Sequence, residues 1–339
     1  MTSAPVVSKA APHAVDMHAH WTPPPLARAL RGRERIPRID GAHGRETYHS
    51  LYGSRPLASL EMSLDERIEW MGANGIAAQM LTLPGLFGVD SLPTQEAAPL
   101  VVLFNDEAAR ACREYPRHFM ALAALPLADM NLACEELRRA CGLGLRGAVL
   151  PVDGFVTLET ARYFEPLLDL AAGLGCHLFI HPGPMPSDGG RQHAPPAQDS
   201  AWLRHIVLGT QARLSEAMVT LNLSGLLDPW PDLTVQVANL GGALPFYAER
   251  IGEVCRCQLN DLQPMAPRLR RCFVDTSSFG PQSIAMAVNC FGADRVVFGT
   301  DCPIFSGAAM QAALNAAPIG DEARHLVCHG NARRLLRLL

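Results

Sequence analysis

The feature that most constrains the fold is a regular alternation of short apolar runs and longer segments with a helical pattern, repeated along almost the whole chain. Strands buried on both faces are continuously apolar, and these runs have that character and the length of strands. Including an opening run that contains histidines, the predicted strands cover residues 15–21, 76–83, 119–127, 147–152, 176–181, 233–240, 272–276 and 295–299.

Each predicted strand is followed by a predicted helix, the first of them after a long intervening segment. Ser63 begins one helix, with Glu66 at the spacing of a capping box, and this helix is expected to stop near residues 74–75. Further helices are expected over residues 94–115, 131–141, 158–174, 202–227, 244–262 and 281–291, and in the remainder up to residue 339.

This order favours an α/β fold with a parallel sheet, and eight units suit a distorted (β/α)8 TIM barrel. An open doubly wound sheet is the alternative. It would favour a glycine-rich phosphate loop after the first strand, and the sequence has none there. We expect a disordered lead-in at 1–12 and a single barrel domain over 13–339, with a loop insertion at about 28–60 that covers one end of the fold.

The composition of the chain argues against nucleic acid and membrane partners. The 339 residues are 48% hydrophobic with a formal charge of −4, and they contain no basic run, so we expect no nucleic acid partner. No window reaches the roughly 18 uncharged apolar residues that span a bilayer, and the first dozen residues lack the apolar core of a secretory signal. We therefore expect a cytoplasmic protein without a membrane partner, whose ten cysteines are reduced.

The lysine content excludes two kinds of chemistry. Lys9, in the expected lead-in, is the only lysine of the chain. Schiff-base catalysis from a core lysine is therefore excluded, and so is a carboxylated lysine that bridges two metals. Any metal centre is expected to be mononuclear.

The first predicted strand contains the motif Asp16-x-His18-x-His20. Residues two apart share one face of a strand, so these three side chains are expected to point the same way. Two imidazoles that converge from one strand end form half of a metal site. The alternative is an ordinary strand that happens to contain histidine, so the remaining ligands have to come from elsewhere.

Two later strand ends supply candidates for those ligands. In a barrel the active site lies at the carboxyl ends of the strands, where His181 precedes Pro-Gly and Asp301 follows Gly-Thr. Three histidines and one aspartate, with a position left for water, suit a catalytic zinc ion. The alternatives are a core role for His181 and a helix cap for Asp301. His177 lies on the same strand as His181 but four residues earlier, toward the opposite end.

Taken together, these motifs resemble the amidohydrolase superfamily. Within it the chain is most similar to the branch of aminocarboxymuconate semialdehyde decarboxylase and its relatives. The segments that carry the resemblance come in the family's order and cover nearly the whole chain, at residues 15–21, 179–183, 240–246, 298–303 and 331–336.

The resemblance implies one divalent metal ion, most often Zn²⁺ with Mn²⁺ as an alternative, and frequent homodimers. The implied ligands are His18, His20, His181 and Asp301, with Asp16 supporting the site. Arg250 corresponds to the family's arginine in the Pro-Phe-x-x-x-Arg segment, and Trp21, at the end of the opening motif, is expected to contact substrate.

One position departs from the family. The decarboxylases usually have a histidine where this chain has Asn239, before Leu240-Gly-Gly. Asparagine is no general base near neutral pH, but it donates and accepts hydrogen bonds. Either Asp301 then carries the proton alone, or the reaction differs from that of the decarboxylases, or the activity is weak. Asn239 is expected to hold substrate and to take part in catalysis through hydrogen bonds.

Three functions remain open at this point. The first is a metal-dependent, non-oxidative decarboxylase of a small unsaturated or aromatic carboxylic acid, which an arginine, either Arg250 or one from the loop ending near residue 55, would hold by a bidentate fork. The second is a hydrolase of an ester, lactone, amide or C–C bond on the same metal, with Asn239 holding a carbonyl oxygen. The third is a non-catalytic binding protein, which the complete ligand set disfavours.

Overall fold

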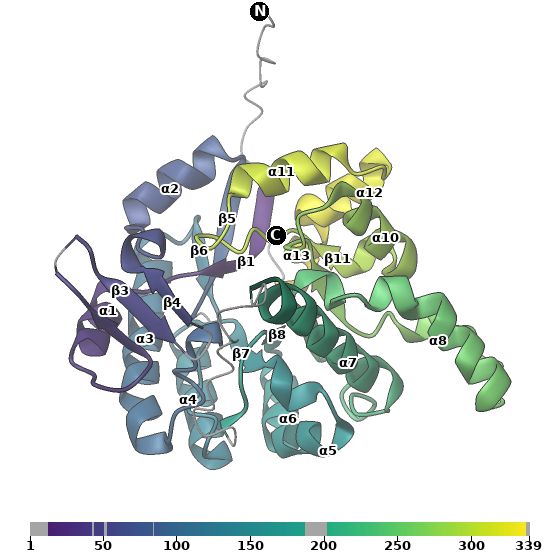
Figure 1. Cartoon of the computed structure of the whole chain (residues 1–339), viewed down its shortest axis with the longest axis horizontal. Helices are drawn as coiled ribbons and strands as arrows, with labels where there is room; N and C mark the ends of the chain where they lie inside the picture. The colour runs from purple at the N-terminus through teal and green to yellow at the C-terminus, as the bar shows by residue number, and fades with distance from the viewer. Residues whose placement is uncertain (1–12, 43, 51–52, 84, 187–201, 337–339) are drawn as a thin grey trace, which may run out of the picture.

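The computed structural model describes residues 13–42, 44–50, 53–83, 85–186 and 202–336. The lead-in predicted for residues 1–12 lies outside them. Eight parallel strands form the centre of the molecule, and helices surround them (Figure 1). In chain order the strands are β1 (Ala14–His20), β5 (Ile76–Thr82), β6 (Phe119–Ala121), β7 (Gly147–Pro151), β8 (His177–His181), β9 (Thr234–Val237), β10 (Phe273–Asp275) and β11 (Val296–Val297).

The strands pair in the order of the sequence, in two parallel groups, β1-β5-β6 and β7 to β11. Single parallel bridges close the gaps between the groups: Ala19 pairs with Cys302, and Ala123 with Ala148. Each strand pairs with its neighbours in sequence, as the predicted (β/α)8 barrel requires, and the two thin junctions account for its distortion.

The helices follow the predicted alternation. They are α2 (Leu64–Ala73), α3 (Thr94–Glu114), α4 (Met130–Gly142), α5 (Leu158–Ala161), α6 (Glu165–Leu174), α7 (Thr210–Leu223), α8 (Leu244–Gln258), α9 (Met265–Arg268), α10 (Pro281–Phe291), α11 (Gly307–Ala316), α12 (Asp321–His325) and α13 (Asn331–Leu335). Among the described residues, the structure has no helix that meets the length and apolarity needed to cross a membrane.

Local chemistry explains where several helices begin and break. Ser63 and Glu66 form the predicted capping box, which satisfies backbone N–H groups at the start of α2. The single helix predicted over 158–174 is wrong. It is split into α5 and α6, and Pro166 stands in the first turn of α6, where its missing N–H costs no helical hydrogen bond.

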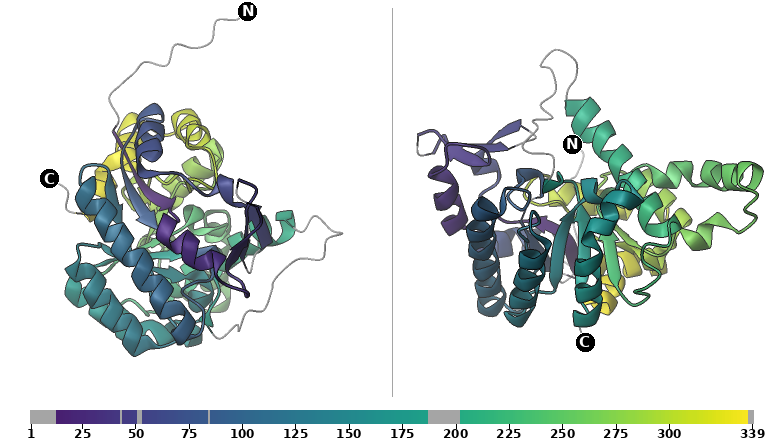
Figure 2. Two further views of the ribbon diagram at one scale, coloured as in Figure 1. Left: turned by 90° about the vertical axis from the view of Figure 1, so that its left-hand side faces the viewer. Right: turned by 90° about the horizontal axis from the view of Figure 1, so that it is seen from below.

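The segment after β1 differs from the predicted loop. It contains α1 (Pro24–Arg31) and an antiparallel sheet of β2 (Arg38–Asp40), β3 (Thr47–Ser50) and β4 (Gly53–Pro56). Figure 2 shows this sheet in purple at one end of the barrel strands. Ile39 pairs with Tyr48, and both are buried in the core. Strands this short, with so few apolar residues, carry no periodicity that predicts them.

Candidate metal centre

Four side chains from three strand ends converge at the carboxyl end of the barrel. His18 and His20 lie on β1, His181 ends β8, and Asp301 follows β11. One ligand atom from each lies within 4.8 Å of the other three. The Nε2 atoms of His18 and His20 are 3.2 Å apart, and Asp301 Oδ1 lies 3.0 Å from His20 Nε2. The sequence motif and the two later strand ends therefore form one cluster, as predicted.

Hydrogen bonds on the far side fix the rings of His20 and His181. His181 Nδ1 donates to the carbonyl oxygen of Pro182 at 3.0 Å. His20 Nδ1 donates to Thr82 Oγ1 at 2.8 Å, since that hydroxyl gives its own proton to the carbonyl of Ala19. With the proton on Nδ1, each ring directs the lone pair of Nε2 into the cluster.

His18 is oriented by a carboxylate. Its Nδ1 lies 3.1 Å from Asp275 Oδ2 and 2.9 Å from Ser277 Oγ. Asp275 also accepts hydrogen bonds from Gln236 Nε2 and the backbone N–H of Ser277. A carboxylate that accepts the outer ring proton of a ligating histidine fixes its tautomer and makes it a better ligand.

The charges around His18 favour a positive charge within the cluster. Burial lowers the pKa of His18, but the carboxylates of Asp275 and Asp301 outweigh burial and raise it to about 10. Burial lowers the pKa of both His20 and His181. Burial would raise the pKa of Asp301, yet the histidines hold it well below its ordinary value. A proton on His18 thus supplies positive charge in the position where a cation would.

A divalent cation fits this donor set. Asp301 Oδ1 is buried, and no group among the described residues donates a hydrogen bond to it. The Nε2 lone pairs of His18 and His20 face each other at 3.2 Å, which is unfavourable unless a cation or proton lies between them. Three imidazoles and one carboxylate suit Zn²⁺ and similar divalent transition metals, whose binding would displace the proton of His18.

Asp16 lies behind the cluster and outside it. It is fully buried and accepts hydrogen bonds from the side chains of Gln79 and Thr300 and from the backbone N–H groups of His18 and Thr300. Burial raises the pKa of Asp16, and these donors oppose that effect. Its contacts join β1, β5 and the segment before Asp301, which is the supporting position that the sequence indicates.

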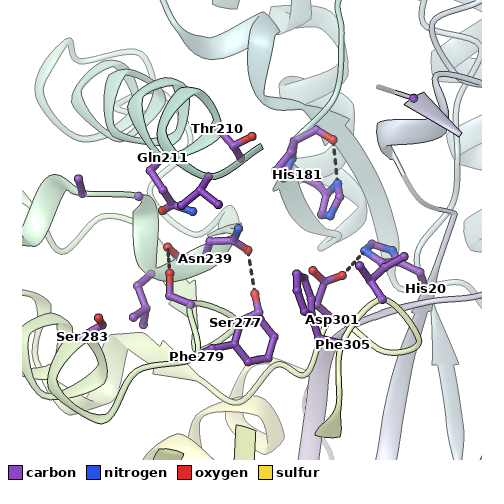
Figure 3. Close-up of a pocket in the computed structure, with 18 of the residues that line it drawn as sticks. His20, His181, Thr210, Gln211, Asn239, Ser277, Phe279, Ser283, Asp301 and Phe305 are labelled. Carbon is purple, nitrogen blue, oxygen red and sulfur yellow. Dashed lines mark hydrogen bonds and ion pairs between the residues drawn. The ribbon is translucent and has the colours of Figure 1, made fainter. Parts of the chain in front are cut away.

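A cavity of about 620 Å³ opens above the cluster, and His20, His181 and Asp301 form part of its wall (Figure 3). Tyr48 and Arg55 of the β2–β4 sheet line it as well. Residues of the insertion therefore contribute to the cavity at the mouth of the barrel.

Asn239 lines this cavity at the end of β9. Its backbone has a positive φ of 53°, a left-handed conformation that asparagine tolerates better than most residues. Ser277 Oγ donates to Asn239 Oδ1 at 2.8 Å, and the backbone N–H of Asn239 donates to Asp275 Oδ1 at 3.2 Å. Figure 3 shows the amide directed toward Ser277.

Two predicted substrate contacts lie elsewhere. Arg250 is exposed on α8 and is not part of the cavity wall, and Trp21 is buried in the hydrophobic core. In the part of the chain that the structure describes, the arginine on the wall is Arg55. Burial lowers the pKa of its guanidinium, and the nearby carboxylate of Asp301 opposes that effect.

Three residues that support His18 were not predicted from the sequence. Asp275 and Ser277 stand at the end of β10, and Gln236 lies within β9. The signal at β10 was present, because Asp275-Thr-Ser stands at the carboxyl end of a predicted strand, at the same end of the barrel as the ligands. Gln236 gave no such signal, since one polar residue inside an apolar strand has many structural explanations.

The chain has counterparts among known proteins. A family model described as Amidohydrolase matches residues 15–338. The chain is 30% identical to gamma-resorcylate decarboxylase of Rhizobium sp. (strain MTP-10005), over 81% of this chain and 87% of the relative. It is also 30% identical to 2-amino-3-carboxymuconate-6-semialdehyde decarboxylase of Dictyostelium discoideum, over 81% of this chain and 76% of the relative.

A solved structure shares the fold. It is a dihydroxybenzoic acid decarboxylase from Polaromonas sp. JS666 with bound manganese and the inhibitor 2-nitroresorcinol. The TM-score is 0.70 at 21% identity, over 96% of this chain and 97% of the other.

Proposed function

The chain belongs to the amidohydrolase family, and from this premise we propose that it is a metal-dependent, non-oxidative decarboxylase of a small aromatic carboxylic acid. The observation that carries the proposal is the four-ligand cluster of His18, His20, His181 and Asp301 at the wall of a single cavity. The two curated relatives compared above are decarboxylases, which favours a carboxy-lyase over a hydrolase on the same ligands.

The proposed cofactor is one divalent ion held by those four side chains. Zn²⁺ is the expected ion and Mn²⁺ is the alternative, since the Polaromonas relative contains manganese and imidazole with carboxylate suits both. When bound, the ion supplies Lewis-acid stabilisation to oxygen atoms of the substrate. Metal analysis of protein purified without chelators identifies it.

Arg55 is the proposed anchor for the substrate. Its guanidinium belongs to a cavity wall that also contains Asp301, and a bidentate fork is the geometry that binds a carboxylate best. Arg250, which the family segment suggested, is exposed outside the cavity. Anchoring by Arg55 would leave the ring of the substrate facing Asn239 and Asp301.

Asp301 is the proposed proton carrier. Because its pKa is held low, this carboxylate is ionised at neutral pH and acts first as a base. Its oxygen takes the proton of an acidic hydroxyl on the substrate. The resulting phenolate donates electron density to the ring carbon that carries the carboxyl group, and that carbon takes the proton back from Asp301. The bond between this carbon and the carboxyl group then breaks, CO₂ leaves, and the electron pair of the bond restores the aromatic ring.

Asn239 has a holding role in this proposal. An amide is neither a general acid nor a general base near neutral pH, but it can donate a hydrogen bond to a substrate oxygen. Ser277 anchors its carbonyl side, which leaves the amino group for the substrate. Asn239→His tests this assignment, and a gain in CO₂ release would contradict a purely holding role.

The test of the function is CO₂ release from a panel of hydroxylated benzoic acids with protein loaded with zinc or manganese. We expect CO₂ and the matching phenol in equal amounts, with activity lost after chelation and restored by the metal. Acid release from model esters or lactones, without CO₂ from any benzoic acid, would instead support the hydrolase. Homodimer formation and a cytoplasmic location remain predictions, and sedimentation of the purified protein tests the first.

A further inference from the structure

The cavity has a second wall that the proposed chemistry does not use. Val207, Phe246, Met286 and Phe305 line it, and they come from the π-helix η6 (Trp202–Gly209), from α8, from α10 and from the segment after β11. All four are large apolar side chains left facing solvent, with exposed fractions between 44% for Met286 and 71% for Phe246. Four separate elements thus bring apolar groups to the same cavity.

This wall is continuous with the metal cluster. The same cavity contains the side chains of His20, His181 and Asp301. Water-exposed apolar surface is unfavourable, and where it gathers in one patch it marks a binding surface. Since the patch and the ligands share one cavity, the occupant that fits best is a molecule that reaches both.

A strained residue contributes to the same wall. Phe279 has a φ of 60°, in the left-handed region that aromatic residues rarely adopt, and such strain gathers at ligand sites. Its ring lies 4.5 Å, centroid to centroid, from that of Phe305. Figure 3 shows the two side chains in the same part of the cavity wall as Asp301. The strained backbone places a second aromatic ring on the apolar side.

The volume of the cavity also favours a ligand that reaches both the metal cluster and the apolar wall. At about 620 Å³ it falls within the range of roughly 300–1,000 Å³ that holds drug-sized ligands. A benzoic acid with small substituents is only a fragment by that standard. Such a molecule would cover the metal cluster and Arg55 and leave the apolar wall in water.

Resting on the proposed decarboxylase function, we infer that the substrate is an aromatic acid with an apolar extension of several carbon atoms. The carboxylate and the ring occupy the part of the cavity near Asp301 and Arg55. The extension lies against Val207, Phe246, Met286 and Phe305. These four residues then determine specificity and take no part in bond breaking.

The test compares the binding of salicylate and 4-hexylsalicylate by calorimetry, with the metal-loaded protein. We expect the hexyl compound to bind at least about tenfold more tightly, because a hydrophobic pocket gains affinity with each buried methylene. Phe246→Ala and Phe305→Ala are each expected to reduce this ratio about threefold or more. Leu259→Ala is the matched control, since Leu259 is 70% exposed beside α8 but does not line the cavity.

Each outcome bears on the inference. Equal affinity for the two acids, or an equal loss of preference in Leu259→Ala, overturns it. A change of sedimentation coefficient in Phe246→Ala with no change in the affinity ratio also overturns it, because the wall would then be an interface between copies of the chain. CO₂ release is measured separately. A strong preference for the hexyl acid without CO₂ would contradict the decarboxylase and leave the extended ligand supported.

Discussion

The two ends of β8 carry the same residue type in two different roles. His177 begins the strand and His181 ends it, and a spacing of four puts both side chains on one face. Both are buried, and burial lowers the pKa of both, to about 4 for His177 and well below the ordinary value for His181. Residue type, exposure and pKa direction therefore do not distinguish them.

Their hydrogen-bond partners do. His177 uses both ring nitrogens: Nδ1 lies 3.0 Å from Thr234 Oγ1, and Nε2 lies 3.2 Å from Gln236 Oε1. His181 uses Nδ1 for the carbonyl of Pro182 and leaves Nε2 as its ligand atom in the cluster. A buried histidine with both nitrogens satisfied is structural, whereas one that keeps a lone pair directed at other ligands is a metal ligand.

The two ends are also connected through Gln236. Its Oε1 lies near His177, and its Nε2 donates to Asp275 Oδ2 at 2.8 Å. Asp275 in turn accepts from His18 Nδ1. A chain of hydrogen bonds thus runs through the barrel interior from the structural histidine to a metal ligand, and substitutions along it measure how far the two roles are separate.

Substitution of His181 is expected to cause the largest loss of CO₂ release and of bound metal. His181→Gln removes one of four ligands, and CO₂ release should fall by about 10³-fold or more, since a bound metal ion contributes several kcal/mol of transition-state stabilisation. Bound metal, measured by atomic emission, should fall in parallel. His177→Gln is the matched control on the same strand. An equal loss of metal in both variants would contradict the distinction between the two ends.

Substitution of Asp275 is expected to cause the next largest effect, a loss of metal affinity. Asp275→Asn keeps the size of the side chain but removes the charge that fixes the Nδ1–H tautomer of His18. Metal affinity should fall by about 10–100-fold, the usual cost of losing an outer partner of a ligand. Competition with a fluorescent chelator measures it. Asp294→Asn, a surface carboxylate paired with Arg270, should leave metal affinity unchanged.

Sequence alone identified the fold and the four ligands for physical reasons. Continuous apolar runs and regular alternation allow few topologies besides a barrel, and all carboxyl ends of its strands meet at one mouth. Once His18, His181 and Asp301 were assigned to strand ends, their convergence followed. The same logic separated His177 from His181 by its place four residues earlier.

Residues whose role depends on side-chain direction were not predictable in this way. The sequence offered Arg250 or one of the arginines of the 28–55 loop as the anchor. Of these candidates Arg55 lines the cavity, because it lies on a small sheet whose strands are too short to have a pattern. The apolar wall was also hidden, because Phe246 and Phe305 are distant in sequence and look like ordinary core residues. Which of them face solvent depends on packing among elements.

Removing the hydrogen bonds of Gln236, which connect the two ends of β8, should have a smaller effect on metal affinity. Gln236→Leu removes the amide that bridges His177 and Asp275 and leaves their polar groups with one partner fewer. An unmade buried hydrogen bond costs about 1–3 kcal/mol, so the urea midpoint should fall, while metal affinity changes by less than about tenfold. Asp275 keeps His18 and Ser277 as donors. A loss of affinity as large as that of Asp275→Asn would place Gln236 in the metal centre.

The smallest effect on activity is expected from substitution of His177. This substitution should instead change how the free energy of unfolding depends on pH. The folded-state pKa of His177 is about 4 against an ordinary value of 6.5, because burial disfavours the charged ring. As the pH falls below 6.5, His177 becomes protonated in the unfolded chain but stays neutral in the folded chain. The contribution of neutral His177 to the free energy of unfolding is therefore complete above pH 6.5 and is lost as the pH falls toward 4. About 2 kcal/mol of it is lost between pH 7 and 5.

His177→Gln isolates that loss from the other titrating histidines, since His20 and His181 are unchanged in the variant. We expect CO₂ release at pH 7 to stay within about threefold of the parent, because neither nitrogen of His177 belongs to the cluster. Urea unfolding at pH 7 and pH 5 should show a smaller decrease in the variant than in the parent. If the two proteins lost the same stability on acidification, the proton uptake would belong to other groups and burial at the base of β8 would not set the pKa of His177.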